Sequence, residues 1–273
     1  MKKLILVLIL VISTYNKILC HPINNISNNI KSFGFIEIYA QVKLKNNIIC
    51  NPLIQSCNKN YHLALFTMNS FLSEVPILKA SSTCIKSDVE SVFITVNHVC
   101  KEINNKDSFK NNEEIIFKNL KSISPNIKRS EIKISFYSHI KNINEKKFKI
   151  IKVIKTANEH DLCLIKVKGN YKNISKVALK EPEIGDPIFN IAVPEGIQFK
   201  DSLPIFTGIF SGKYENTRLL KSYLLSIPAS QGSSGSPVFN DKGEIIGIIY
   251  AAFTNFSHLS ISSTIDQVRR LIR

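Results

Sequence analysis

The stretch Gly232-Ser233-Ser234-Gly235-Ser236-Pro237 places a serine between small residues. Small neighbours leave a serine hydroxyl accessible, and they let backbone N–H groups converge on one point beside it. Such donors, here the N–H groups of Gly232 and Ser234, can hold the negative oxygen that forms when a hydroxyl attacks a carbonyl. Taken alone, the pattern also fits a plain Gly/Ser-rich turn between two strands.

Two upstream segments supply partners for this serine. The first is an apolar strand that ends in a polar turn presenting His98: Ile94-Thr95-Val96-Asn97-His98-Val99-Cys100. In the second, Asp161 precedes the apolar strand Leu162-Cys163-Leu164-Ile165-Lys166-Val167. Each is by itself more often structural than catalytic. A serine nucleophile needs a base for its proton and a carboxylate that fixes the imidazole tautomer. The order His, Asp, Ser therefore predicts Ser234 as nucleophile, His98 as general base and Asp161 as the residue that orients it.

The rest of the sequence predicts an all-β chain. Short runs rich in Ile, Val, Phe and Tyr alternate with Asn, Lys, Gly, Pro and Ser, which is typical of a barrel or a sandwich. One helix is expected at the end of the sequence, because Ser263-Thr264 precedes Ile265, Val268 and Leu271 at helical spacing. Residues 101–126 are the least patterned, and we expect a surface excursion there with a short helix over 113–121.

On these three segments the sequence resembles the trypsin-like serine peptidases, closest to the bacterial high-temperature-requirement and glutamyl endopeptidase branch. Minor matches support the likeness at residues 184–188, 192–196 and 207–212. The resemblance implies two packed six-stranded antiparallel β-barrels of the chymotrypsin-like fold and a short C-terminal helix, with the triad in the cleft between the barrels. We expect a peptidase domain over 33–273, divided into a barrel over about 33–176, a barrel over about 177–262 and a helix over 263–273. No cofactor, no metal and no following PDZ domain are expected.

Departures from the family pattern bear on activation and specificity. Ser233 stands where zymogen-type trypsins carry the Asp that pairs with a new amino terminus, so we expect a site that assembles without an activation cut. The resemblance also suggests residues that line the primary specificity pocket: Ile227, Pro228, Ala229, Ile249, Tyr250, Ala251 and His258. None is an Asp, which disfavours a preference for Lys or Arg. A small or apolar pocket is the first expectation, and His258 leaves an acidic preference open.

The first residues are typical of a targeting segment. Met1-Lys2-Lys3 is positive, and residues 4–12 form an unbroken apolar run that is short for a membrane-spanning helix. We expect a signal peptide over 1–20 and a secreted or periplasmic protein, with an uncleaved anchor as the alternative. Residues 21–32 are Asn-rich and polar, and we expect them to be loosely ordered.

Export would permit disulfides among the six cysteines. Proximity in sequence favours Cys84–Cys100 and Cys50–Cys57, and Cys163 in its apolar strand then stays a buried free thiol. No CxxC pair and no ligand-like histidine spacing occur, so no metal site is predicted. The sequons at Asn25, Asn173 and Asn255 would matter only in a eukaryotic secretory route.

The net charge of +15 comes from 36 Lys and Arg against 21 Asp and Glu. The positive residues are spread along the chain without an Arg cluster or an aromatic platform, so we expect a protein or peptide substrate and not nucleic acid as the partner. Weak attraction to acidic polymers or anionic membranes stays open, as does membrane attachment through an uncleaved amino-terminal segment.

Three function classes compete. The first is an active secreted serine endopeptidase, and the complete triad favours it. The second is a catalytically inactive homologue that acts as a binding protein. The third is a lipase or esterase of the α/β-hydrolase class, which is disfavoured because its nucleophile turn needs Gly where Ser236 stands and because too few residues follow Ser234 for its later strands.

Overall fold

The computed structural model describes residues 23–44, 75–123, 125–198, 202–215, 220–253 and 256–273. The expected signal peptide over 1–20, the expected Cys50–Cys57 pair and the sequon at Asn255 lie outside the described residues.

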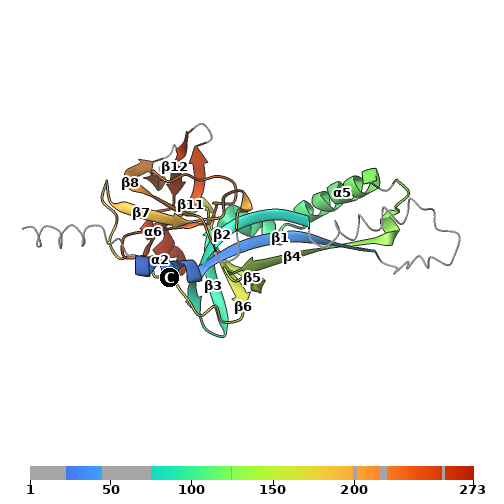
Figure 1. Cartoon of the computed structure of the whole chain (residues 1–273), viewed down its shortest axis with the longest axis horizontal. Coiled ribbons are helices and arrows are strands. Elements are labelled where there is room, and N and C mark those ends of the chain that lie inside the picture. Colours follow the sequence, from blue (N-terminus) through green and yellow to red (C-terminus); the bar gives the residue numbers. More distant parts are fainter. Residues whose placement is uncertain (1–22, 45–74, 124, 199–201, 216–219, 254–255) are drawn as a thin grey trace, which may run out of the picture.

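Twelve described strands form two closed barrels in which every neighbouring pair is antiparallel (Figure 1). The first barrel has the order β1-β2-β3-β6-β5-β4 and the second β10-β11-β12-β9-β8-β7. The first six strands are β1 (Phe33–Leu44), β2 (Val75–Ser87), β3 (Glu90–Val96), β4 (Ile132–Lys141), β5 (Lys147–Ala157) and β6 (Leu162–Lys168). The second six are β7 (Pro187–Ile191), β8 (Ile205–Glu215), β9 (Lys221–Leu225), β10 (Pro237–Phe239), β11 (Ile245–Phe253) and β12 (Phe256–Ser262). The predicted fold class is confirmed.

One apolar cluster joins the two barrels. Ile94 and Ile165 of the first barrel belong to the same buried set as Phe239 and Ile248 of the second, and Val268 of the last helix completes it. Because burial of apolar area is the main favourable term in folding, this shared cluster holds the barrels at a fixed relative position. Any site between them therefore has a defined geometry.

The last helix, α6 (Ile265–Ile272), is where the sequence predicts it. Thr264 is the N-cap, and its side chain accepts a hydrogen bond from the Gln267 N–H group. Ile265, Val268 and Leu271 are buried, as their spacing indicates. The helix contacts β5, β6 and β11, and so rests on both barrels.

The expectation of a loosely ordered segment over 21–32 is wrong for residues 23–32, which form α2 (Ile23–Ser32). The polar side chains that suggested disorder find buried partners instead. Asn29 donates its side-chain N–H to the Gly243 carbonyl at 3.1 Å, and the Ser32 hydroxyl lies 2.6 Å from that of Ser175. The amino-acid composition of a segment does not show partners that are this distant in the sequence.

The region expected to be a surface excursion is also more regular than predicted. It contains the end of α4 (Asn97–Asn104) and all of α5 (Lys106–Ile123), and α5 is twice as long as the short helix expected over 113–121. Ile116 and Leu120, one turn apart, pack on Ala40 and Val42 of β1. In Figure 1, α5 lies along the extended ends of β1, β2 and β4. The many Lys and Asn residues of α5 make its apolar face difficult to recognise from the sequence.

No helix among the described residues has the length and apolar character needed to cross a membrane.

Candidate active site

His98 and Asp161 form a close pair at the edge of the first barrel. The Nδ1 atom of His98 lies 2.6 Å from Oδ2 of Asp161, and the other carboxylate oxygen, Oδ1, accepts the backbone N–H of His98 at 2.9 Å. A carboxylate can only accept hydrogen bonds, so Nδ1 carries the proton and Nε2 presents its lone pair. The His98 side chain is 47% exposed and can reach an external reactant.

The backbone around Asp161 explains why an aspartate opens this strand. Asp161 follows the short helix η2 (Asn158–His160) and has φ of 50°, a left-handed conformation that Asp tolerates better than most residues. Its carbonyl accepts the Asn97 N–H at 3.0 Å, and the Asn97 side chain donates to Asn158 at 2.6 Å. Both sides of the pair are thus fixed by their own backbones.

A disulfide joins Cys100 of α4 to Cys163 of β6, with 6.6 Å between their Cα atoms. Each cysteine stands two residues after a member of the pair, Cys100 after His98 and Cys163 after Asp161. The predicted Cys84–Cys100 bridge is wrong, and so is the prediction that Cys163 is free. The reason is strand pairing: β3 lies against β6 with Val96 opposite Leu162, which brings the start of α4 to Cys163 across a long sequence separation.

The free thiol among the described cysteines is Cys84, which is buried. It donates to the Lys86 carbonyl at 3.4 Å, and burial raises its pKa to about 12. Cys84 therefore stays protonated at neutral pH and is a poor nucleophile.

Ser234 lies in the loop between β9 and β10. The positions on either side of Ser233-Ser234 in this loop, Gly232 and Gly235, require glycine. Gly232 and Gly235 have φ of 93° and 87°. A Cβ atom at Gly235 would lie 2.1 Å from both the Ser81 carbonyl and the Thr95 hydroxyl, and one at Gly232 would lie 2.3 Å from the Val193 carbonyl. Glycine is required at these two positions because the loop backbone packs directly on β2, β3 and the Val193 carbonyl.

Ser81 of β2 ties this loop to the first barrel. Its N–H donates to the Ser234 carbonyl at 2.9 Å, and its hydroxyl donates to the Gly232 carbonyl at 2.9 Å while accepting the Val193 N–H at 3.3 Å. The Thr95 hydroxyl in turn donates to the Ser81 carbonyl at 2.7 Å. Thr95 stands three residues before His98, so a short chain of contacts connects the His98 segment with the Ser234 loop.

Sequence reasoning missed Ser81. The signal available was the run Ala80-Ser81-Ser82-Thr83, small and polar residues in the middle of a strand, all of them fully buried. Buried hydroxyls need partners, so such a run indicates close backbone contact with another element.

The residues predicted for the specificity pocket lie on the loop after β9, on β11 and on β12, and their role stays a prediction. Ile227 and Ile249 are buried in the second barrel's own core, while Pro228, Ala229, Tyr250 and Ala251 are half-buried. His258 is exposed, and its ring meets Phe256 edge-on.

Tyr250 of β11 has a half-buried side chain whose hydroxyl is hydrogen-bonded. Its hydroxyl lies 2.7 Å from that of Ser222. Burial raises the pKa of Tyr250, so its phenol stays protonated at neutral pH.

Across the described part of the chain, no group of three or more His, Cys, Asp or Glu side chains could hold a metal ion.

Comparison with known proteins adds the family. The family model for the trypsin-like peptidase domain matches residues 80–248, which is more than half of the chain. This chain belongs to the trypsin-like peptidases. The match includes His98, Asp161 and Ser234, and it runs from within β2 to within β11.

More distant likenesses agree with this family. The serine protease HtrA-like proteins of Staphylococcus aureus strains USA300 and NCTC 8325 are 23% identical over 138 residues, which cover 45% of this chain and only 18% of theirs. Rv3671c from M. tuberculosis H37Rv, crystallised as an inactive form of a serine-to-alanine mutant, superposes with a TM-score of 0.54 at 11% identity, over 93% of this chain and 90% of that chain. At this identity the structural likeness supports the fold alone.

The disulfide assignment can be checked without any functional assay. Alkylation of the denatured, unreduced protein should modify Cys84, and digestion should release a cross-linked peptide pair containing Cys100 and Cys163. Replacing both bridged cysteines by alanine should cost about 4 kcal/mol of stability, because the bridge closes a long loop. Urea unfolding measures this loss, and a Cys84–Cys100 cross-link in the mass spectrum would contradict the assignment.

Ser81→Ala should slow peptide hydrolysis by disturbing the loop between β9 and β10 that carries Ser234. The variant leaves the Gly232 carbonyl and the Val193 N–H without their buried partner, and we expect kcat to fall about tenfold to a hundredfold with little change in KM.

The matched control is Ser82→Ala, since the buried Ser82 hydroxyl donates to Gly34 at 2.7 Å and does not touch the loop. Both variants should unfold at lower urea concentration than the wild type, and only Ser81→Ala should lose kcat. Equal kcat losses in the two variants would show that Ser81 acts through stability alone.

Proposed function

We propose that this chain is a secreted serine endopeptidase that cleaves protein or peptide substrates through an acyl-enzyme on Ser234. The observation that carries the proposal is the 2.6 Å contact between His98 Nδ1 and Asp161 Oδ2 inside a trypsin-like peptidase fold. The pair supplies a base whose tautomer is fixed, and the loop packed on Ser81 carries the proposed nucleophile, Ser234.

The proposed reaction assigns one role to each of His98, Asp161 and Ser234. Nε2 of His98 takes the Ser234 hydroxyl proton as Oγ attacks the substrate carbonyl, and the imidazolium that forms is stabilised by Asp161. His98 then gives the proton to the leaving amine, so the acyl-enzyme forms as the peptide bond breaks. A water molecule, activated by the same imidazole, hydrolyses the ester and restores Ser234.

The N–H groups of Gly232 and Ser234 are the proposed oxyanion donors. The carbonyl on the other side of the Gly232 peptide, that of Gln231, accepts the Glu195 N–H at 2.6 Å. In a trans peptide the C=O and N–H groups point in opposite directions, so this contact aims the Gly232 N–H away from Glu195. Within the described part of the chain neither donor has an acceptor, which supports their availability to a substrate oxygen.

The loop also supports a site that needs no activation cut. The Ser233 N–H donates to the Ser230 carbonyl at 2.9 Å, and the Ser233 hydroxyl accepts the Ser230 N–H at 3.2 Å. These two contacts close the turn from within, so no newly formed amino terminus is required to order it.

Secretion and the primary specificity complete the proposal. The Cys100–Cys163 bridge supports an oxidising compartment, where such bonds persist. The small side chains of Ala229 and Ala251 support a preference for small or apolar residues before the scissile bond, with Ile227 and Ile249 closing the interior side.

Ser234→Ala tests the nucleophile. We expect turnover to fall roughly a millionfold with folding intact, as for other serine-protease triads. The measurement is labelling by a serine-directed fluorophosphonate, followed by mass spectrometry of the modified peptide.

The control is Ser122→Ala, which removes an exposed hydroxyl at the end of α5, far along the chain from the site. It should label like the wild type. A wild-type protein that takes no label would overturn the proposed function, as would a Ser234→Ala protein that labels at the wild-type rate.

A further inference from the structure

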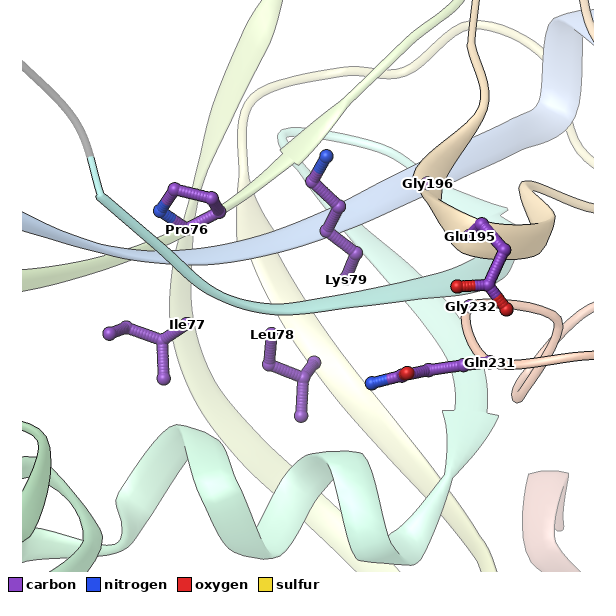
Figure 2. A pocket seen from close by; sticks show the side chains of 8 residues that line it. All are labelled: Pro76, Ile77, Leu78, Lys79, Glu195, Gly196, Gln231 and Gly232. Atoms are coloured by element: carbon purple, nitrogen blue, oxygen red, sulfur yellow. The ribbon is translucent and has the colours of Figure 1, made fainter.

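A cavity of about 220 Å³ lies beside the nucleophile loop, and the chemistry above does not use it. Three elements line it: β2, the short helix η3 (Pro194–Gly196) and the loop before Ser234. The residues that matter for its character are Ile77, Leu78, Lys79, Glu195, Gln231 and Gly232 (Figure 2). The cavity thus draws its walls from both barrels.

The position of the cavity fits the leaving-group side of Ser234. On the far side of the nucleophile, Gly235 donates its N–H to Ile249 of β11, the strand that carries the predicted acyl-side pocket. The cavity instead begins at Gly232 and extends along β2, the strand whose Ser81 carbonyl accepts the hydroxyl of Thr95, three residues before His98. Because His98 protonates the leaving amine, the substrate segment after the scissile bond is expected on the flank nearer the His98 segment.

A β-bulge gives the cavity an apolar wall. In the pairing of β1 with β2, Ile38 lies opposite Leu78 and Tyr39 opposite Pro76, so Ile77 is an extra residue. A bulge interrupts the alternation of a strand, and Ile77 and Leu78 therefore point to the same side of β2 (Figure 2). Lys79 also lines the cavity, but its side chain points to the opposite side of β2 and packs against Gly196. A Cβ atom added at Gly196 would lie 2.3 Å from the Lys79 Cδ atom.

Glu195 places a carboxylate at the end of this apolar wall. Its backbone is held in a left-handed conformation, with φ of 52°, and its N–H is the group that binds the Gln231 carbonyl. The side chain is exposed and forms no ion pair with any described residue. In Figure 2 the Glu195 carboxylate and the Gln231 amide lie near each other at the loop end of the cavity, beyond Leu78.

We propose that this cavity binds a Lys or Arg side chain that the substrate carries in the first two positions after the scissile bond. A long aliphatic stem would lie along Ile77 and Leu78, and the cationic head would reach the Glu195 carboxylate and the Gln231 amide oxygen, which suits side chains with an apolar stem and a charged end. The inference rests on the proposed endopeptidase function. It adds a preference for basic residues after the scissile bond, which is independent of the preference for the residue before that bond.

The experiment maps cleavage sites. The mature wild-type protein and its Glu195→Gln and Glu195→Lys variants each digest a denatured proteome, and mass spectrometry identifies the residues on both sides of every cut. We expect Lys and Arg to be enriched in the first two positions after the wild-type cuts. Glu195→Gln should reduce the enrichment about twofold to fivefold, the scale of one exposed ion pair, and Glu195→Lys should shift it towards Asp and Glu.

The matched control is Glu145→Gln. Glu145 also has a left-handed backbone, with φ of 60°, and its side chain is exposed, but it does not line the cavity. This variant should keep the wild-type enrichment. Two synthetic peptides from one mapped site, with Lys or Met after the scissile bond, then give kcat/KM directly, and only the Lys peptide should lose rate on Glu195→Gln.

The outcomes separate this inference from the proposed function. A protein that takes the fluorophosphonate label on Ser234 and cuts substrates without enrichment of basic residues refutes the inference and leaves the endopeptidase intact. Enrichment that survives both Glu195 variants also refutes it. A protein that neither labels nor cuts refutes the proposed function and this inference together.

Discussion

The contact between Ser81 and the nucleophile loop is the constraint on which the site depends. His98 and Asp161 belong to the first barrel and Ser234 to the second, so neither barrel contains all three residues of the proposed triad. Ser81 spans the gap with one backbone and one side-chain hydrogen bond to the loop. Because Ser81 is fully buried, loss of either bond leaves one of its polar groups or that of its partner unsatisfied, and the two barrels are held together beside the proposed site.

In the first barrel, several short-range contacts restrain His98. Asp161 binds both the ring and the backbone N–H of His98, the Asn97 and Asp161 backbones meet, and the Cys100–Cys163 bridge lies just behind them. Each restraint removes a different freedom of the imidazole: its tautomer, its position along α4 and the distance between α4 and β6. A base restrained in this way need not reorganise when the proton moves, which is the condition for efficient general-base catalysis.

The parts of the fold and site that sequence could predict are those with local causes. The strand pattern, the capped helix after Thr264, and the chain order of His98, Asp161 and Ser234 are all visible within short windows, and the structure has the two barrels and the helix that they indicate. The errors concern partners that are distant in sequence. Cys163 pairs with Cys100 because β3 lies against β6, α2 is ordered through Asn29 and Ser32 contacts with remote residues, and Ser81 acts on a loop in the other barrel. The extra residue in β2 at Ile77, and the cavity that it helps to form, likewise depend on a register that only the folded chain reveals.

The central claim is that His98, held by Asp161, serves Ser234 in one site assembled across two barrels. Proton NMR of the His98 Nδ1–H group tests it most directly, since a proton shared closely with a carboxylate gives a strongly deshielded signal. The account predicts this signal in the wild type, its persistence in Ser234→Ala, its loss in Asp161→Asn, and a shift when a fluorophosphonate occupies Ser234. A signal that is absent from the wild type, or that does not respond to the adduct on Ser234, would contradict the account.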